Sequence, residues 1–140
     1  MRAVLAGILF ACVLAEGAQA CSCAPNPTAA GIRQSSSAVF TGIATSSRRA
    51  GPGEAITTFK IIESFKGPAA GAIVQVRHPD GSSAACGVRF ATGETHTLAA
   101  VATRAQRPLS ANLCSVWMFL PQVGLSERLI GELRAMRGRP

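Results

Sequence analysis

The sequence has little of what enzymes and nucleic-acid-binding proteins usually use. It contains no tyrosine, one tryptophan and six phenylalanines, so few aromatic rings are available for base stacking. Its seven acidic residues are scattered, and its two histidines, His78 and His96, lie 18 positions apart. No His-Glu-x-x-His, Gly-x-Ser-x-Gly or phosphate-binding glycine motif is present. We therefore expect no enzymatic activity, no cofactor, and histidines that are sheet or surface residues rather than ligands.

Long hydrophobic segments are also scarce. The one extended apolar run, Ala3 to Ala15, has 13 residues, fewer than the about 20 that a membrane-spanning helix needs. Arg2 precedes this run and Ala18-Gln19-Ala20 follows it, which is the pattern of a cleaved export signal. We predict a signal peptide over 1–20 and one domain over 21–140, with no membrane span.

Two other interpretations of the N-terminus remain. Residues 1–20 could form a buried helix, although no other segment is an evident partner for it. They could also be a lipoprotein signal that leaves Cys21 acylated. Such signals usually carry leucine three residues before the cysteine, where this chain has Ala18. We therefore rank removal of the signal and release into the periplasm or the extracellular space first.

Four cysteines remain after this cleavage, namely Cys21, Cys23, Cys86 and Cys114. An even number in a small exported domain predicts disulfides. A bond between Cys21 and Cys23 would close a small strained ring, so each should pair with a different distant cysteine, in either of two arrangements. Each bond would contribute roughly 4–5 kcal/mol on a chain-entropy basis. A four-thiolate zinc site is the alternative, but the usual Cys-x-x-Cys pairs are absent.

Alternating apolar and polar residues predict several short strands. The expected strands cover 38–46, 55–65, 72–78, 85–90, 95–102 and 112–120. Phe59, Ile61 and Phe65 should share one face of the second strand, and Arg48 and Arg49 should lie at the tip of a loop. Short strands with frequent turns indicate a small β-sandwich or β-barrel.

Helices are expected at the two ends of this domain. Asn26 and Pro27 suit the cap and first position of a short N-terminal helix. Near the C-terminus, Ser126 is a candidate N-cap and Gly138 a stop signal. Between them an apolar stripe with helical spacing predicts a face that packs on the core, formed by Leu125, Leu129, Ile130, Leu133 and Met136.

The expected mature terminus has a chemistry of its own. A free α-amino group and the carbonyl of the same residue can close a five-membered chelate ring on a metal ion, provided that the amine is neutral. Chain ends are usually too mobile for this. Bonds at Cys21 and Cys23 would fix the end, and Ser22 would then point outward because side chains alternate along an extended chain. The simpler interpretation is that the disulfides only stabilise the fold.

The start Cys21-Ser-Cys-Ala-Pro25 resembles the N-terminus of the tissue inhibitors of metalloproteinases and, more broadly, of netrin-like modules. The resemblance extends along most of the mature chain, through SSAVFTGIA, FKIIESFKG, SAACGVRFATGETHTLAA and NLCSVWMFL. It implies a mainly β fold, a five-stranded barrel of the oligonucleotide/oligosaccharide-binding (OB) type with a short N-terminal and a C-terminal helix. It also implies the disulfides Cys21–Cys86 and Cys23–Cys114.

In function, the resemblance implies a secreted, monomeric inhibitor of zinc metalloendopeptidases, with the protease as its partner. The amine and carbonyl of Cys21 would bind the catalytic zinc of the protease, and the side chain of Ser22 would enter the adjoining specificity pocket. Cys23, Ala24 and Pro25 would continue along the cleft, and the region of Cys86 and Gly87 would form a neighbouring ridge.

The chain also departs from the inhibitor pattern. No cysteine lies between 24 and 85 for the third disulfide of the inhibitors, none follows Cys114, and Ser36 and Ser37 stand where an acidic residue is common. The alternative function is therefore an exported netrin-like binding module that does not inhibit proteases. Nucleic-acid binding is a third possibility, because the chain is basic with a formal charge of +7, but export argues against it.

Overall fold

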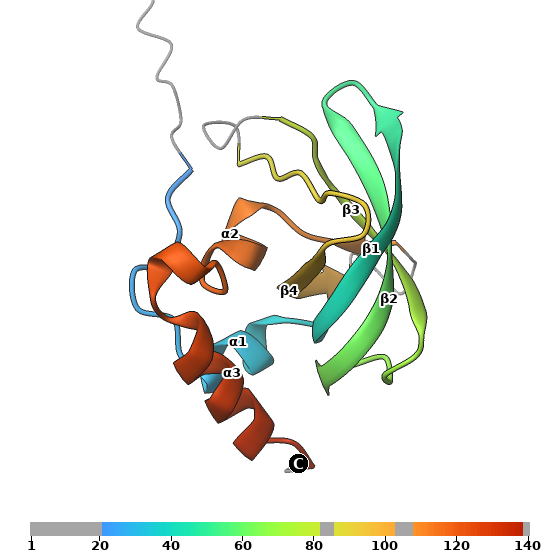
Figure 1. Cartoon of the computed structure of the whole chain (residues 1–140). Helices are drawn as coiled ribbons and strands as arrows, with labels where there is room; N and C mark the ends of the chain where they lie inside the picture. Colours follow the sequence, from blue (N-terminus) through green and yellow to red (C-terminus); the bar gives the residue numbers. More distant parts are fainter. Residues whose placement is uncertain (1–20, 82–85, 103–107, 139–140) are drawn as a thin grey trace, which may run out of the picture.

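The computed structural model describes residues 21–81, 86–102 and 108–138, so the predicted signal peptide lies outside the described residues. The fold is mainly β, as expected, with helices at its periphery (Figure 1). The strands are β1 (Ala38–Gly51), β2 (Glu54–Lys66), β3 (Ile73–Pro79), β4 (Thr95–Ala102) and β5 (Leu109–Ser110). The helices are α1 (Ala29–Ser35), α2 (Leu113–Trp117) and α3 (Ser126–Ala135), and a short 3-10 turn, η2, spans Pro121–Val123.

The five strands form a closed ring in the order β1-β2-β3-β5-β4. Neighbouring strands are antiparallel except β3 and β5, which run parallel. Strand β5 was not predicted from the sequence, because its two residues are too few for an alternating pattern. Helices α1, α2 and α3 lie on the same side of this ring (Figure 1).

The ring encloses the main hydrophobic core. Its largest fully buried side chains include Phe40 from β1, Phe59 and Ile61 from β2, and Leu98 from β4. Along their strands these residues alternate with residues that face outward, as the two-residue period of a strand requires. The predicted strands at 55–65, 72–78 and 95–102 are confirmed to within one residue at each end.

Phe65 does not share the face of Phe59 and Ile61, and that prediction is wrong. A β-bulge leaves Ile62 without a partner on β1, since Gly42 pairs with Ile61 and Thr41 with Glu63. An extra residue in one strand shifts the alternation that follows it. Phe65 therefore packs outside the ring, in a second hydrophobic cluster.

This second cluster fills the space between the ring and the helices. Val39, Phe65 and Ala99 face outward from the sheet and meet Leu129 and Leu133 of α3, both fully buried. The predicted apolar stripe is thus confirmed as a core-facing surface. Burial of each leucine contributes about 1.5–3 kcal/mol.

The ends of the helices differ slightly from the predictions. Thr28, not Asn26, caps α1, because its Oγ1 accepts a hydrogen bond from the Gly31 N–H at 3.1 Å. In α3, Ser126 is the first helical residue rather than the cap, and Leu125 precedes it without a side-chain cap bond. Gly138 adopts a left-handed conformation (φ 77°) just beyond the helix, as expected of a stop signal.

Charged side chains hold the helices in place. The Lys66 Nζ donates to the carbonyls of Arg33 (2.5 Å) and Ser36 (2.6 Å) at the C-terminal end of α1. Arg33 in turn donates to the carbonyl of Met136 at the end of α3, at 2.6 Å. Positive groups at helix C-termini satisfy carbonyls that have no partner within the helix.

Strand β1 is longer than predicted. It continues through Arg48 and Arg49 to Gly51, so these arginines lie within a strand and not at a loop tip. The turn contains Gly53, whose positive φ of 67° suits glycine. Because β4 pairs with β1 only from Ala38 to Ile43, residues 45–51 of β1 pair with β2 alone among the described strands.

Two other predicted strands are absent. The run 112–120 begins with α2, because Asn112 and Ser115 form a reciprocal capping box at its start. Of the run 85–90, the described part, 86–90, is irregular and is attached through a hydrogen bond from the Val88 N–H to the Pro79 carbonyl at 3.0 Å.

Candidate functional site: the disulfide-anchored N-terminal segment

Two disulfides attach the N-terminal segment to the body of the protein. They join Cys21 to Cys86 and Cys23 to Cys114, with Cα–Cα distances of 5.0 and 5.2 Å. This is the pairing that the family resemblance implies. The Cys21 and Cys114 sulfurs lie 3.7 Å apart, so the two bridges touch.

The sulfurs of Cys21, Cys23 and Cys114 lie within 4.8 Å of one another, a spacing that would suit a metal ion if they were thiolates. All three are disulfide-bonded, however, and the fourth cysteine, Cys86, is too. In this state none of the four offers the thiolate through which cysteine binds zinc.

The two anchor points form one structural unit. Cys114 is the second residue of α2, and the Leu113 N–H, at the start of the same helix, donates to the Cys86 carbonyl at 2.9 Å. The capping box of α2 fixes its first turn. Both cysteines of the N-terminal segment are therefore held by the same small, hydrogen-bonded region.

The backbone around Cys86 is unusual. Cys86 has a φ of 57°, the left-handed region that costs a non-glycine residue about 1–3 kcal/mol. The next residue, Gly87, is buried, and a Cβ at this position would lie 2.7–2.8 Å from backbone atoms of Gly81. Glycine is thus required here for close packing. That Gly87 contributes to a ridge facing the protease stays a prediction.

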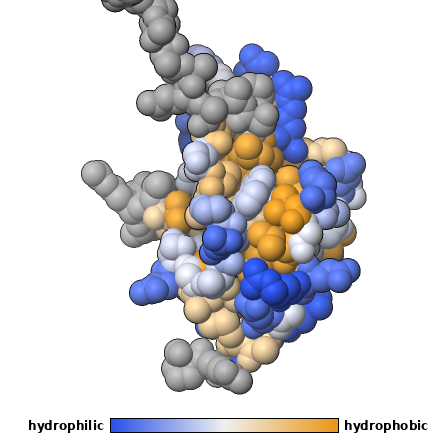
Figure 2. Space-filling model, turned by 90° about the vertical axis from the view of Figure 1, so that its left-hand side faces the viewer, coloured by the Kyte–Doolittle hydropathy of each residue, from blue (hydrophilic) through white to orange (hydrophobic). Residues whose placement is uncertain are grey.

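Exposure along the segment alternates as the sequence analysis expected. Cys21 and Cys23 are half-buried, whereas Ser22 between them and Ala24 and Pro25 after them are exposed. Residues 21–27 include no charged side chain. On the face of the molecule that carries this segment, apolar patches are interrupted by polar side chains (Figure 2). Such mixed composition is common to protein surfaces and to non-obligate interfaces.

The titratable groups with shifted pKa values lie on other elements. The Arg134 guanidinium, with Arg137, lowers the pKa of Glu63 on β2 from 4.5 to about 2. Burial lowers the pKa of His96 on β4, and its Nε2 has no hydrogen-bond partner among the described residues. His78 on β3 is buried and bonds through Nε2 to the Thr57 hydroxyl at 2.8 Å. Both histidines are sheet residues, as predicted.

The phenylalanine rings are not displayed for stacking. The five phenylalanines of the described residues, which exclude Phe10, are all at most 6% exposed. They therefore offer no face to a nucleobase. The described helices include none that is long and apolar enough to cross a lipid bilayer.

A concave site elsewhere on the protein was not predicted from the sequence. It lies between the outer part of the β1–β2 hairpin, the end of β3 and residues 89 and 90. These segments are distant in the sequence, and only the strand register brings them together. No short motif could have indicated the site, because its residues come from four separate segments of the sequence.

No model of a known protein family and no curated protein matches the sequence.

Proposed function

We propose that the protein is a secreted inhibitor of zinc metalloendopeptidases that acts through the Cys21 end of its mature chain. The observation that carries this proposal is the double anchoring of residues 21–23. Both cysteines are disulfide-bonded to one rigid region, while Ser22 between them is exposed. A short terminal segment held in this way has the geometry of a wedge.

The proposed metal binding depends on the α-amino group of the mature N-terminus. Once residues 1–20 are removed, Cys21 has a free α-amino group, which can be neutral near pH 8. Together with its own carbonyl, this amine forms a bidentate ligand for a metal ion. Catalytic zinc sites retain an open coordination position, which structural zinc sites do not. The metal therefore belongs to the target protease, and the inhibitor itself needs none.

Neighbouring residues would complete the contact. The Ser22 side chain, small and exposed, enters the specificity pocket beside the zinc, and Ala24 and Pro25 extend along the cleft. Cys86 lies beside this segment because it is bonded to Cys21. We assign these residues as the contact surface, with Cys23 as its second anchor.

Anchoring also favours binding energetically. Fixing the backbone of one residue costs about 1–2 kcal/mol, so ordering three residues at the moment of binding would cost about 3–6 kcal/mol. Because the disulfides and the contact between them order these residues during folding, this cost does not reduce the free energy of binding. Preorganisation of this kind raises affinity without any new contact.

The fold assignment belongs to the same proposal. We infer an OB-type, netrin-like barrel from the closed ring of five strands, with its one parallel pair, β3 and β5, and its flanking helices. The disulfides lie where the resemblance to metalloproteinase inhibitors implies them. The third disulfide of those inhibitors has no counterpart, because residues 24–85 contain no cysteine.

The experiment that tests this proposal displaces the α-amino group of the mature chain. An extra alanine before Cys21 displaces the α-amine by about 3.3–3.6 Å and turns the old amine into an amide. We expect the processed protein to inhibit members of a panel of zinc metalloendopeptidases, and the extended protein to inhibit none of them. An alanine added after Pro140 is the matched control and should leave inhibition unchanged. Equal unfolding midpoints would show that both variants fold.

Two results would overturn the proposal. One is equal inhibition by the extended and the processed proteins. The other is an intact mass of the native protein that shows residues 1–20 retained or an acyl group on Cys21. The expected mass is that of residues 21–140 less four hydrogens, for two disulfides. With a blocked Cys21, the protein would be a netrin-like binding module without protease inhibition.

A further inference from the structure

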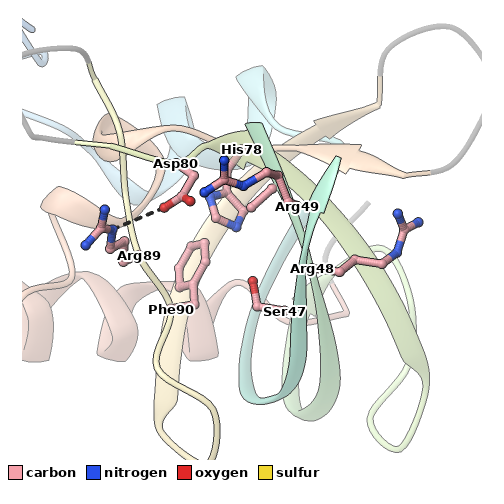
Figure 3. A pocket seen from close by; sticks show the side chains of 8 residues that line it. Ser47, Arg48, Arg49, His78, Asp80, Arg89 and Phe90 are labelled. Carbon is pink, nitrogen blue, oxygen red and sulfur yellow. Dashed lines mark hydrogen bonds and ion pairs between the residues drawn. The ribbon is translucent and has the colours of Figure 1, made fainter. Parts of the chain in front are cut away.

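A cavity of about 340 Å³ opens beside the β1–β2 hairpin (Figure 3). Its lining comprises Ser47, Arg48, Arg49, Ala55, His78, Asp80, Arg89 and Phe90. Small-molecule sites typically fall in the range of about 300–1,000 Å³. The cavity is thus large enough for a compact ligand.

Strand register explains why the surface is hollow here. Arg49 of β1 pairs with Ala55 of β2, and Ala55 pairs with His78 of β3, so the three residues form one row across the sheet. Ala55 has the smallest side chain of the row and lies between two long ones. The hollow therefore exists because a methyl group stands where a larger side chain would fill it.

The floor of the cavity is held by a chain of hydrogen bonds. Ser47 Oγ and Thr57 Oγ1 are 2.9 Å apart, and Thr57 Oγ1 lies 2.8 Å from the His78 Nε2. The Pro79 carbonyl, a pure acceptor, is 3.3 Å from the His78 Nδ1. His78 also packs edge-on against Phe90, with ring centroids 4.9 Å apart. The buried side of the site is therefore preorganised.

The rim is positively charged. The lining contains three guanidinium groups and one carboxylate, a net charge of +2. Arg89 donates to Asp80 at 3.1 Å, which accounts for the one negative group. Neither Arg48 nor Arg49 has a hydrogen-bond or ion-pair partner among the described residues, and the undescribed residues contain a single acidic side chain, Glu16. The nearby pair Glu54–Arg77 is neutral overall.

The two arginines of β1 point in different directions. The guanidinium of Arg49 extends over His78 toward Asp80, on the same side as Arg89, whereas Arg48 points away from this group (Figure 3). Successive side chains of a strand alternate in this way. Arg49 and Arg89 thus present their charged groups on the side of Asp80, whereas Arg48 lines the edge of the cavity and directs its guanidinium group away from it.

We propose that this cavity binds a small molecule through a phosphate group. The guanidinium groups of Arg49 and Arg89 lie on either side of Asp80 (Figure 3), and a guanidinium group can donate two parallel hydrogen bonds to phosphate oxygens. A phosphate monoester carries a charge of about −1.5 to −2 at pH 7, which matches the net charge of the lining. The space beyond the phosphate takes the group that carries it. This proposal is independent of protease inhibition, since none of residues 21–25 lines the cavity.

Calorimetric titration of the purified full chain with inorganic phosphate and with glycerol 3-phosphate, at constant ionic strength, tests the site. We expect saturable binding of one equivalent. Arg49→Gln and Arg89→Gln should each weaken binding about tenfold or more, because each removes charge-assisted hydrogen bonds. Arg48→Gln, the matched control, removes the same charge next to Arg49 and should weaken binding by no more than about threefold.

A variant that changes no charge tests whether binding depends on the shape of the cavity as well as on its charge. Ala55→Leu leaves every charge in place and fills the hollow, so binding should be lost while circular dichroism stays that of the parent. Sedimentation with vesicles containing phosphatidic acid shows whether the phosphate can belong to a lipid headgroup. Vesicle binding that depends on Arg49 but not on Arg48 would support the site with a lipid as its ligand.

The proposal fails if binding does not saturate, or if Arg48→Gln and Arg49→Gln weaken it equally. Either result would indicate attraction by net charge alone. Undiminished binding by a folded Ala55→Leu variant would also overturn it. If that variant does not fold, the comparison of Arg48 with Arg49 still decides the question, since both are exposed residues of one strand.

Discussion

Replacing Glu63 with glutamine would remove the negative charge that joins α3 to the sheet. Glu63 receives two hydrogen bonds from Arg134, at 2.8 and 2.9 Å, and a third from Arg137. Arg137 also lies over the Phe65 ring, 5.6 Å from its centroid. The carboxylate thus holds the last turn of α3 and the residues just beyond it.

The magnitude follows from the pKa of Glu63, which the Arg134 hydrogen bond lowers from 4.5 to about 2. Converted in full at about 1.4 kcal/mol per pKa unit, this difference would stabilise the fold by about 3 kcal/mol. Arg134 and Arg137 leave 58% and 49% of their side chains exposed, however, and water screens such pairs. We therefore expect Glu63→Gln to lower the free energy of unfolding by about 1–2 kcal/mol at pH 7.

The dependence on pH has a definite sign. A carboxyl group whose pKa is lowered by folding stabilises the folded state when it is ionised, above pH 4.5. This stabilisation is lost as the pH falls from about 4.5 toward 2. The difference in unfolding free energy between the parent and Glu63→Gln, measured by urea denaturation, should therefore shrink across this interval.

Glu132→Gln is the matched control, because Glu132 forms an exposed ion pair with Arg128, four residues earlier on α3. It should cost no more than about 0.5 kcal/mol. If Glu63→Gln costs no more than Glu132→Gln, or costs as much at pH 2.5 as at pH 7, the carboxylate does not anchor α3 in the way described.

Three further predictions concern single positions. Gly87→Ala should destabilise the protein by about 1–3 kcal/mol, because a Cβ would meet the Gly81 backbone at 2.7–2.8 Å. Gly131→Ala, in open space on α3, is the control and should be neutral or stabilising. Equal shifts of the thermal unfolding midpoint in the two variants would contradict this. Lys66→Met should cost about 1–3 kcal/mol in urea denaturation, because it removes the amine that donates to two carbonyls at the end of α1. An unchanged midpoint would mean that water replaces the amine. Replacing Ser22 with leucine should change the relative inhibition of different metalloproteases by roughly 10–200-fold without changing the unfolding midpoint. If the inhibition constants of all proteases change by the same factor, Ser22 does not contact the specificity pocket.

Much of the fold follows from local patterns. The alternation in 55–65, 72–78 and 95–102 predicts β2, β3 and β4, and the stripe from Leu125 to Met136 predicts α3, because each pattern is long enough to fix its period. The run 112–120 is apolar on all sides and fits a helix or a strand. The signal in the sequence that indicated a helix was the spacing of Asn112 and Ser115, which are three residues apart and form a capping box.

Features that depend on pairing between distant segments could not be predicted. The bulge at Ile62, which moves Phe65 to the outer cluster, is a property of the register between β1 and β2. The residues themselves narrowed the disulfides to two arrangements, and only the family resemblance selected between them. The cavity depends on Arg49, Ala55 and His78 lying in one row, which the sequence does not display.

The outer half of β1 has a consequence for solubility. Its residues 45–51 pair with β2 alone among the described strands, which leaves a row of backbone groups available to another molecule. Arg48 and Arg49 lie on this edge. Two copies that met edge to edge would bring four guanidinium groups together, and their repulsion opposes such pairing. The same arginines that suit the edge to an anion would thus keep a β-rich protein from polymerising through its own strand.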